Sequence, residues 1–353
     1  MTENSTVRID GTDAEFHCRD ETILDAALGA GLALPHNCRG GACGTCKVEV
    51  LEGEVDHGWD MGFAISDAEK AAGRCLICMS RPRSSRLVLR LLGAPPVRPG
   101  VSSTPAEYEV KVVAAHDLAP DLRELVLYVP DKTGFRFAPG QHVELIVPGL
   151  QLSRPYSIAQ APASDGSAVA GLIRLFVTRH PHGASSGWIH AHARTGRRVT
   201  LRGPYGQFAP LDATRSLLMF AGGSGLAPLL AVAEARVGAG DGLVELWLSV
   251  RTKADVFALD RLGALAAGSP DFVFRVFVTR PAADALPEGW MGERIPTHLG
   301  RTRPDLSGTS VMIAGSPGFV AACRSAVVAC GASEGRVVVE AYESRPAVSV
   351  GAV

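Results

Sequence analysis

The pattern of hydrophobic and polar residues differs between three regions of the chain. In the first 92 residues, short alternating or apolar runs predict four strands, at 6–9, 15–17, 47–51 and 86–92. A helix is expected over 21–31 with Asp20 as its N-cap. Its apolar face carries Ile23, Leu24, Ala27 and Leu28. The pattern predicts a small first domain, residues 1–92, that has more strand than helix.

Residues 107–210 form a second region, in which turn signals separate short strands. Six strands are expected, at 108–114, 123–129, 142–147, 156–159, 172–178 and 198–202. Only one helix is expected, over 185–193. Many short strands with one helix predict an antiparallel β-barrel.

From residue 211 to residue 345 strands alternate with helices. The expected strands are 217–221, 244–249, 272–279, 310–314 and 336–340, and the expected helices are 226–237, 256–267 and 318–331. This alternation predicts a Rossmann-like α/β domain with a parallel sheet and nucleotide chemistry at its carboxyl edge. The Pro-rich segment 93–106 reads as a linker, and 346–353 as a C-terminal tail. The whole chain is therefore expected to be multidomain, α+β followed by α/β.

Composition and charge exclude several classes of protein. With 46% hydrophobic and 20% charged residues, the chain is neither disordered, collagenous nor a coiled coil. A formal net charge of −1 gives no electrostatic basis for binding nucleic acid. The N-terminus lacks an apolar signal region, and the longest uncharged apolar stretch, 216–233, is short and broken by glycines. We expect a cytoplasmic protein that binds neither nucleic acid nor a membrane.

Five of the eight cysteines fall between Cys38 and Cys78. Cys38, Cys43 and Cys46 are spaced C-x4-C-x2-C, and Cys78 follows, which is the plant-type spacing for a 2Fe–2S cluster. The glycines between them let backbone N–H groups approach the sulfurs closely. Zinc sites usually pair two C-x2-C arms, and a Rieske centre needs two histidines. We therefore predict a four-cysteine cluster on Cys38, Cys43, Cys46 and Cys78.

Cys75 competes with Cys78 for the fourth ligand position. Cys78 lies in the short loop expected before the last strand of the first domain, which favours it as the ligand. Cys75 is then a buried thiol that binds no metal. Cys18, Cys323 and Cys330 fall on apparent strand or helix faces and are expected in the core.

The motif Arg154-Pro155-Tyr156-Ser157 opens an expected strand of the second region. An Arg fork can hold a pyrophosphate, a Tyr ring can stack on a flat heterocycle, and a Ser hydroxyl can bond a ring nitrogen. The segment 183–189 places small and hydroxyl residues at the start of the only expected helix, a suitable anion site. The segment 203–208 reads as a plain structural turn.

A glycine-rich loop, Gly222-Gly223-Ser224-Gly225, follows a buried strand and opens the next helix, which contains Pro228. This is the context of a loop that cradles phosphates. The loop matches neither G-x-G-x-x-G nor the Walker A motif, so a glycine turn without phosphate is the alternative.

These motifs, in this order, closely resemble the NAD(P)H-dependent iron–sulfur flavoprotein reductases of multicomponent aromatic-ring oxygenases. The reductases of benzoate and terephthalate dioxygenases are the most similar in domain order, and the resemblance extends from about residue 6 to residue 345. It implies an N-terminal β-grasp ferredoxin domain, a β-barrel domain that binds FAD and a C-terminal domain that binds NAD(P). The family belongs to the ferredoxin–NADP reductase superfamily.

The resemblance also implies roles for single residues. FAD would be bound by Arg154, Tyr156, Ser157, Gly183 and Ser186. The nicotinamide dinucleotide would be bound by Gly222, Gly223, Ser224, Gly225, Pro228, Asp255, Thr279 and Arg280. Ser157, Glu340 and Tyr342 would be the catalytic residues near the nicotinamide and the flavin. Two features depart from the family: Ala314 replaces the usual Cys, and 11 residues follow Tyr342.

The function that the resemblance implies is an NAD(P)H-dependent oxidoreductase of the ferredoxin–NAD(P) reductase type. Electrons would pass from the nicotinamide through FAD and the 2Fe–2S cluster to a terminal aromatic-ring-hydroxylating dioxygenase, directly or through a ferredoxin. The family favours NADH, whereas Thr279 and Arg280 would suit the 2′-phosphate of NADPH; we expect NADH. The alternatives are a reductase for a diiron monooxygenase or a deoxysugar dehydratase, a redox sensor of low turnover, and a structural metal-binding protein.

Overall fold

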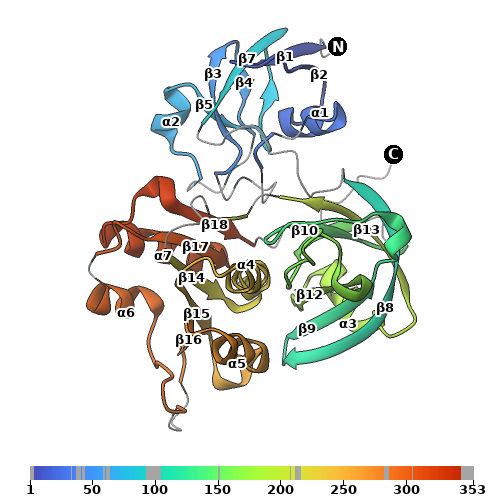
Figure 1. Ribbon diagram of the computed structural model, residues 1–353. Coiled ribbons are helices and arrows are strands. Elements are labelled where there is room, and N and C mark those ends of the chain that lie inside the picture. The colour runs from blue at the N-terminus through green and yellow to red at the C-terminus, as the bar shows by residue number, and fades with distance from the viewer. Residues whose placement is uncertain are drawn as a thin grey trace. The chain divides into compact units, whose positions relative to one another are not determined.

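The chain divides into two compact units, residues 1–100 and 101–353. The computed structural model (Figure 1) describes residues 4–32, 34–36, 41, 44–58, 60, 64–92, 105–149, 152–206, 208–210, 216–281, 286–303 and 305–342. The expected linker 93–106, apart from its last two residues, and the expected tail 346–353 lie outside the described residues.

The first unit is built on a mixed five-stranded sheet in the order β2-β1-β7-β3-β5. Its strands are β1 (Ser5–Ile9), β2 (Glu15–Cys18), β3 (Lys47–Glu52), β5 (Arg74–Leu76) and β7 (Arg86–Leu91). The β1–β7 pair is parallel and the other pairs are antiparallel. The helix α1 (Ile23–Gly29) buries its apolar face in the core of this unit. A second pair, β4 (Val55–Asp56) with β6 (Arg81–Pro82), and the short α2 (Asp67–Ala71) complete the β-grasp fold that was expected.

Two details of this unit differ from the sequence expectation. Thr22, not Asp20, caps α1, because the Thr22 side chain accepts a hydrogen bond from the backbone N–H of Asp25. The Asp20 carbonyl instead accepts a hydrogen bond from Arg81. The helix α2 was not expected, although its capping box, Ser66 with Glu69, is a recognised start signal.

The second unit begins with six antiparallel strands in the order β11-β10-β13-β8-β9-β12. They are β8 (Ala106–Ala119), β9 (Leu122–Tyr128), β10 (His142–Val147), β11 (Leu152–Ser157), β12 (Leu172–Thr178) and β13 (Arg198–Tyr205). A bridge between Ile158 and Leu175 joins the two outer strands, so the sheet closes into the expected barrel. Its α-helix is α3 (Ala184–His192), and the 3₁₀ turns are η1 (Asp131–Thr133) and η2 (Val169–Gly171).

The Arg154–Ser157 motif ends the strand β11, whereas it was expected to open a strand. The strand begins earlier, at Leu152, and continues through Pro155. Except for the bridge at Ile158, β11 pairs only with β10, and proline is compatible with such an outer strand.

The rest of the second unit is a five-stranded parallel sheet in the order β16-β15-β14-β17-β18. Its strands are β14 (Leu217–Gly222), β15 (Val244–Val250), β16 (Phe272–Val278), β17 (Ser310–Gly315) and β18 (Val337–Ala341). Its helices are α4 (Leu226–Ala239), α5 (Leu259–Gly268), α6 (Ile295–Thr302) and α7 (Pro317–Ala329), with the 3₁₀ turns η3 (Gly223–Gly225), η4 (Lys253–Asp255) and η5 (Glu334–Arg336). The strand order reverses at β14, which confirms the expected Rossmann-like domain. In such sheets ligands bind at the carboxyl end of the strand where the order reverses.

Two helices of this domain differ from expectation. The helix α5 begins at Leu259 rather than Val256, because Ala258 adopts a left-handed conformation with φ of 57°. The helix α6 was not expected, since only Ile295 and Leu299 supply its buried side. Among the described helices, none combines the length and apolar character needed to cross a bilayer.

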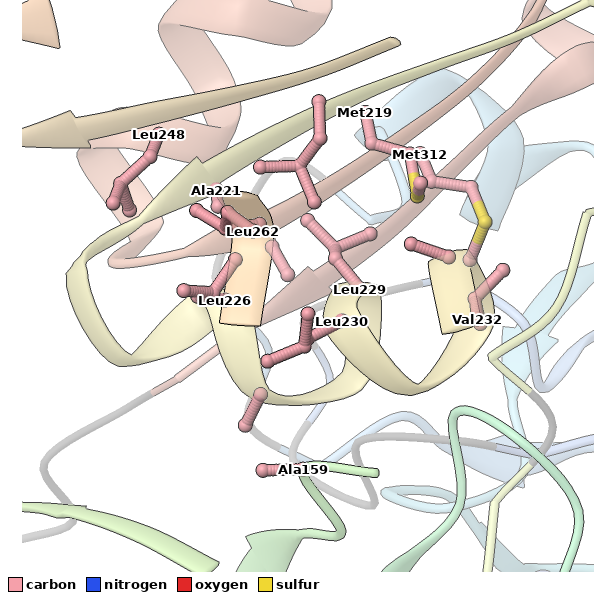
Figure 2. Packing of buried hydrophobic residues seen from close by; sticks show 14 of the residues in the cluster. Ala159, Met219, Ala221, Leu226, Leu229, Leu230, Val232, Leu248, Leu262 and Met312 are labelled. Carbon is pink, nitrogen blue, oxygen red and sulfur yellow. The ribbon is translucent and has the colours of Figure 1, made fainter. Parts of the chain in front are cut away.

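The barrel has a hydrophobic core of its own, and the core of the parallel sheet extends to the barrel residues Leu122, Ala159, Phe176 and Phe208. Figure 2 shows α4 between the strand that carries Met219 and the barrel segment that carries Ala159. The barrel residues Phe176 and Phe208 belong to the same buried cluster, and the Phe176 ring meets Phe257 edge to face at 5.4 Å. Because burial of apolar surface is the main force in folding, this shared core holds the two domains of the second unit together.

Candidate functional site

Two of the four predicted cluster cysteines meet at one point of the first unit. Cys46 lies just before β3 and Cys78 lies in the turn after β5, and their Sγ atoms are 3.1 Å apart. Both residues are buried, with exposed fractions of 2% and 6%. The predicted ligands Cys38 and Cys43 lie outside the described residues.

The surroundings of these thiols fit an iron–sulfur cluster. The 3.1 Å between the two Sγ atoms is far longer than the roughly 2.05 Å of a disulfide, so two soft sulfur donors converge without a bond between them. Gly41 and Gly44 have φ angles of 72° and 75°, a left-handed conformation that glycine adopts without strain. The backbone of the loop can therefore fold close to a bound cluster.

Cys75 is fully buried on β5. Burial raises the pKa of its thiol to about 12, against a weaker opposing effect of the Ser80 hydroxyl. Since metals bind the thiolate, this environment suits a buried thiol that is not a ligand. Cys18, Cys323 and Cys330 are also buried, as expected of core residues.

The flavin motif occupies the end of β11. Arg154 and Tyr156 share one face of the strand, because side chains alternate along it, and Ser157 points the opposite way. Tyr156 is half-buried and packs against the barrel core. Burial raises the pKa of its phenol, although Ser185 of α3 and the charge of Arg154 partly oppose this, so the ring stays neutral. A neutral aromatic ring beside a guanidinium suits a flat ring system that carries a pyrophosphate.

The start of α3 forms a tight loop around Gly183 and Ser186. The Ser186 Oγ accepts a hydrogen bond from the backbone N–H of His180 at 3.1 Å and donates one to the Gly183 carbonyl at 3.3 Å. A Cβ at Gly183 would lie 2.5 Å from that Oγ, so a side chain there would displace the Ser186 hydroxyl from these bonds. Because the first N–H groups of a helix have no partners within it, the loop can receive a phosphate.

The glycine-rich loop is tightly packed on one side and open on the other. A Cβ at Gly222 would lie 2.8 Å from the Phe319 ring, and a Cβ at Gly225 would lie 2.1 Å from the Ala314 carbonyl oxygen. Gly223 has φ of 54° and would place its Cβ more than 4 Å from any other group. The backbone at Gly223 is therefore accessible to a phosphate, while its neighbours anchor the loop. Pro228 is buried within α4.

The three predicted catalytic residues are joined by hydrogen bonds. Ser157 Oγ donates to Glu340 Oε1 at 2.9 Å and lies 3.0 Å from the Tyr342 hydroxyl. Glu340 lies on β18 and is only 4% exposed, and the Tyr342 backbone N–H donates to the Gly315 carbonyl at 2.8 Å. This group connects the end of the flavin strand with the end of the nucleotide sheet.

The environment of Tyr342 keeps its hydroxyl protonated. Burial, and then the negative charge of Glu340, raise the pKa of Tyr342 well above its usual value. The hydroxyl can therefore donate a hydrogen bond to Ser157 throughout the physiological pH range. Ala314, which replaces the usual family cysteine, is fully buried at the end of β17 and offers no polar side chain. The 11 residues after Tyr342 lie outside the described residues.

The remaining predicted dinucleotide residues lie at the carboxyl ends of β15 and β16. Asp255 Oδ2 accepts hydrogen bonds from the Thr252 N–H and hydroxyl, both at 2.8 Å, so its carboxylate caps the turn η4. Thr279 Oγ1 donates to the Val250 carbonyl at 3.2 Å. The Arg280 N–H donates to the Arg251 carbonyl at 2.8 Å, which places these two exposed arginines on neighbouring strand ends.

One contact at this site had no signal in the sequence. Thr178 Oγ1, at the end of the barrel strand β12, donates to Ser224 Oγ at 2.9 Å. The bond ties the flavin barrel directly to the glycine-rich loop. Thr178 ends an ordinary strand, and no motif marks it as a partner of the loop.

Three family models match consecutive parts of the chain. A 2Fe-2S iron-sulfur cluster binding domain matches residues 7–83, an oxidoreductase FAD-binding domain matches 109–209, and an oxidoreductase NAD-binding domain matches 219–325. The chain thus carries a 2Fe–2S domain, an FAD domain and a nicotinamide nucleotide domain, in the order that the motifs predicted.

Whole-chain comparisons agree with these models. The chain is 30% identical to the reductase component of a propane 2-monooxygenase from Gordonia sp. over 91% of this chain and 92% of that protein. The structure of a cytochrome P450 reductase from Amycolatopsis is 30% identical with a TM-score of 0.76, covering 96% of this chain and 98% of the other. The ferredoxin reductase in a carbazole 1,9a-dioxygenase is 27% identical with a TM-score of 0.67, covering 97% and 99%. The chain therefore belongs to the family of NAD(P)H-dependent iron–sulfur flavoprotein reductases that supply electrons in oxygenase systems.

Proposed function

We propose that this chain is the reductase component of an aromatic-ring-hydroxylating dioxygenase system, with NADH as its preferred donor. The observation that carries the proposal is the hydrogen-bonded group of Ser157, Glu340 and Tyr342, which joins the flavin strand to the nucleotide sheet. Bound flavin supplies the conversion between a two-electron hydride donor and a one-electron iron–sulfur acceptor. A buried group at the junction of both domains is well placed to orient the reacting rings.

Each residue of the group has a distinct role in this proposal. Glu340 accepts a hydrogen bond from the Ser157 hydroxyl and thereby fixes the direction of that hydroxyl. Tyr342 keeps its own proton and holds the Ser157 oxygen from a second side. With its hydrogen directed to Glu340 and one lone pair bonded to Tyr342, the Ser157 oxygen keeps one lone pair that would accept a hydrogen bond from a protonated ring nitrogen of the flavin. Ser157 and Glu340 are themselves buried, with exposed fractions of 7% and 4%.

The other predicted residues complete the proposed sites. Arg154, Tyr156, Gly183 and Ser186 would hold FAD. The dinucleotide would be held by Gly222, Gly223, Ser224, Gly225, Pro228, Asp255, Thr279 and Arg280, and the cluster by Cys38, Cys43, Cys46 and Cys78. The proposed domains are 1–92, 107–210 and 211–345. Free thiols at Cys18, Cys75, Cys78, Cys323 and Cys330 suit a cytoplasmic location.

Spectra and turnover of the purified protein test this function. We expect flavin absorbance together with 2Fe–2S absorbance, bleaching of both by NADH without oxygen, and rapid NADH-dependent reduction of cytochrome c. Absence of either chromophore, or spectra that neither NADH nor NADPH changes, would contradict the proposal. Bleaching with very slow cytochrome c reduction would indicate a redox sensor instead.

The terminal oxygenase has two candidate classes. A dioxygenase is supported by the likeness to the carbazole 1,9a-dioxygenase reductase, which covers 97% of this chain. A monooxygenase is supported by the likeness to the propane 2-monooxygenase reductase. Affinity purification of the tagged chain from its native host, grown on an aromatic carbon source, should recover a dioxygenase, directly or with a ferredoxin. Recovery of a monooxygenase instead would favour the second class.

The choice of donor depends on the cations at the ends of β15 and β16. We expect higher kcat/KM for NADH than for NADPH. Measurable NADPH activity is also expected, because the exposed cations Arg251 and Arg280 on neighbouring strand ends would suit a 2′-phosphate. Arg280→Ala should lower kcat/KM for NADPH by about tenfold, since one charge-assisted hydrogen bond contributes about 1.5 kcal/mol or more. It should leave kcat/KM for NADH within twofold.

The exposed barrel residue Arg198 provides the control for this measurement, because its removal lowers the positive charge equally. Arg198→Ala should leave kcat/KM unchanged for both donors. Equal loss for both donors in Arg280→Ala would contradict the assignment, and a wild-type preference for NADPH would reverse the choice of donor.

FAD binding should depend on Tyr156 and Arg154. Tyr156→Ala removes the ring proposed to stack on the flavin, and Arg154→Ala removes the proposed pyrophosphate partner. Each should raise the dissociation constant of FAD by about tenfold or more, in line with the energy of aromatic and charge-assisted contacts. Titration of the apoprotein with FAD, followed by flavin fluorescence, measures this constant. Tyr128→Ala, at an exposed tyrosine of the same barrel, should bind FAD normally, and full flavin content in both test variants would contradict the motif.

A further inference from the structure

A short segment that follows the flavin strand is held by an ion pair of the nucleotide domain. Arg261 of α5 and Glu234 of α4 are 2.5 Å apart, and their side chains are 27% and 22% exposed. Arg261 Nη2 also donates to the Ala159 carbonyl at 2.7 Å. The other carboxylate oxygen, Glu234 Oε2, accepts from the Ala161 N–H at 2.9 Å.

The two charges match the backbone groups that they contact. The cation binds a carbonyl, the anion binds an N–H, and both groups belong to one stretch of three residues, 159–161. Hydrogen bonds to charged groups are shorter and stronger than neutral ones, and partial burial increases their strength. The ion pair therefore fixes both the position and the direction of this segment against α4 and α5.

Apolar packing supports the same position. Ala159 is fully buried and belongs to the cluster formed by Leu226, Leu229 and Leu230 of α4. Figure 2 shows Ala159 on the barrel segment that faces α4. On its other side the segment is tied to the barrel, because the Ala159 N–H donates to the Arg174 carbonyl at 2.8 Å. The segment is thus the point at which polar bonds connect the flavin strand, the barrel and two helices.

This anchor lies two residues from Ser157. An extended chain spans about 3.3 Å per residue, so Ala159 and Ser157 are about 7 Å apart along the backbone and are linked with little slack. Ser157 is itself held by Glu340 of β18. The segment 157–161 is consequently fixed to the nucleotide domain at both ends, by β18 at one end and by α4 and α5 at the other.

We propose that Arg261 and Glu234 are positioning residues, which set the distance and orientation between the flavin strand and the nucleotide site. The inference rests on the proposed transfer of hydride from NADH to FAD. Loss of the pair removes the polar bonds that hold residues 159–161 to α4 and α5 and leaves only apolar packing, so that Ser157 can shift relative to Glu340. Hydride transfer is sensitive to such shifts, since a misplacement of about 1 Å can cost a factor of about 100 in rate.

The test compares Arg261→Gln with wild type and with Arg275→Gln. Arg275 of β16 forms a similar pair with Glu245 at 3.0 Å, within the nucleotide sheet and without contact to residues 159–161 among the described bonds. In Arg261→Gln, flavin reduction by NADH in anaerobic stopped-flow should slow by about tenfold or more. The dissociation constant for NAD⁺, measured by flavin absorbance, should stay within twofold. Arg275→Gln should match wild type in both measurements.

Amide hydrogen exchange gives a readout that does not depend on turnover. Exchange in a peptide covering residues 157–162 should rise in Arg261→Gln and remain unchanged in Arg275→Gln. Arg261→Lys, which keeps the charge, should recover part of the rate and of the protection. Where Arg261→Gln does not fold, Glu234→Gln, which keeps the shape of the side chain, takes its place with the same expectations.

Two failures of this experiment have different meanings. If neither NADH nor NADPH reduces the wild-type flavin, the proposed function is wrong and the positioning role falls with it. If the wild type is reduced but Arg261→Gln keeps its rate or its exchange pattern, only the positioning role is wrong. An equal loss of rate in Arg275→Gln, or a rise in the NAD⁺ dissociation constant that accounts for the slower rate, overturns it as well.

Discussion

Cys78→Ser should abolish the 2Fe–2S absorbance, whereas Cys75→Ser should retain it. The Sγ of Cys78 lies 3.1 Å from that of Cys46, so the two thiols point at one site. The thiol of Cys75 is fully buried, with its pKa raised to about 12, and belongs to the core of the domain. Visible absorbance, iron content and the paramagnetic signal of the reduced protein distinguish the two variants.

The same pair of variants separates the cluster from the flavin. Cys78→Ser should keep its FAD and its flavin reduction by NADH, because the proposed residues for both lie in the second unit. It should lose nearly all NADH-dependent reduction of cytochrome c, since the one-electron path is removed. Retention of the cluster in Cys78→Ser together with its loss in Cys75→Ser would exchange the two assignments.

Motifs were predictable from the sequence where a fixed residue spacing coincides with a change from a strand pattern to a helix pattern. The glycine-rich loop, for example, was recognised because a buried apolar strand precedes it and a helix follows it, and the loop is found between β14 and α4. The hydrophobic run of β14 contains no polar residue from Leu217 to Gly222, so its burial follows directly from composition. Such local signals also identified the barrel and the parallel sheet.

The ends of helices and strands were less predictable where a single hydrogen bond or a single backbone conformation decides them. The cap of α1 could be Asp20 or Thr22 by residue type, and only the hydrogen bond from Asp25 selects Thr22. The start of α5 moved to Leu259 because Ala258 takes a left-handed conformation that its residue type does not announce. The Arg154–Ser157 motif was expected to open a strand, whereas it ends β11, an outer strand that accommodates Pro155 near its end.

Contacts between parts of the second unit that are distant in the chain were not predictable from the sequence. In the sequence Arg261 and Glu234 look like ordinary charges on the surface of helices. Only the structure shows that the barrel segment 159–161 packs on them. Thr178 meets Ser224 only because β12 ends beside the glycine-rich loop. The same holds for Phe319, whose ring lies over Gly222. These contacts depend on how helices and strands pack, which residue spacing alone does not encode.

Gly225 is the position of the loop with the least room for a side chain. A Cβ there would lie 2.1 Å from the carbonyl oxygen of Ala314 and 2.4 Å from its carbonyl carbon. Both are backbone atoms of β17, a central strand of the sheet, so neither can rotate away as a flexible side chain would. The loop must therefore move if any side chain is added.

Gly225→Ala should consequently impair the dinucleotide site while leaving FAD and the cluster bound. We expect the free energy of unfolding to fall by about 2 kcal/mol, as in other overpacked positions, and flavin reduction by NADH to slow by about 100-fold, because the loop is displaced by about 1 Å. Thermal unfolding and anaerobic stopped-flow measure the two effects. Gly318→Ala is the control: a Cβ there meets no atom within 4 Å, and alanine favours the helix α7, so stability should be equal or slightly higher and the rate unchanged. Normal flavin reduction in Gly225→Ala would show that the loop does not position the donor.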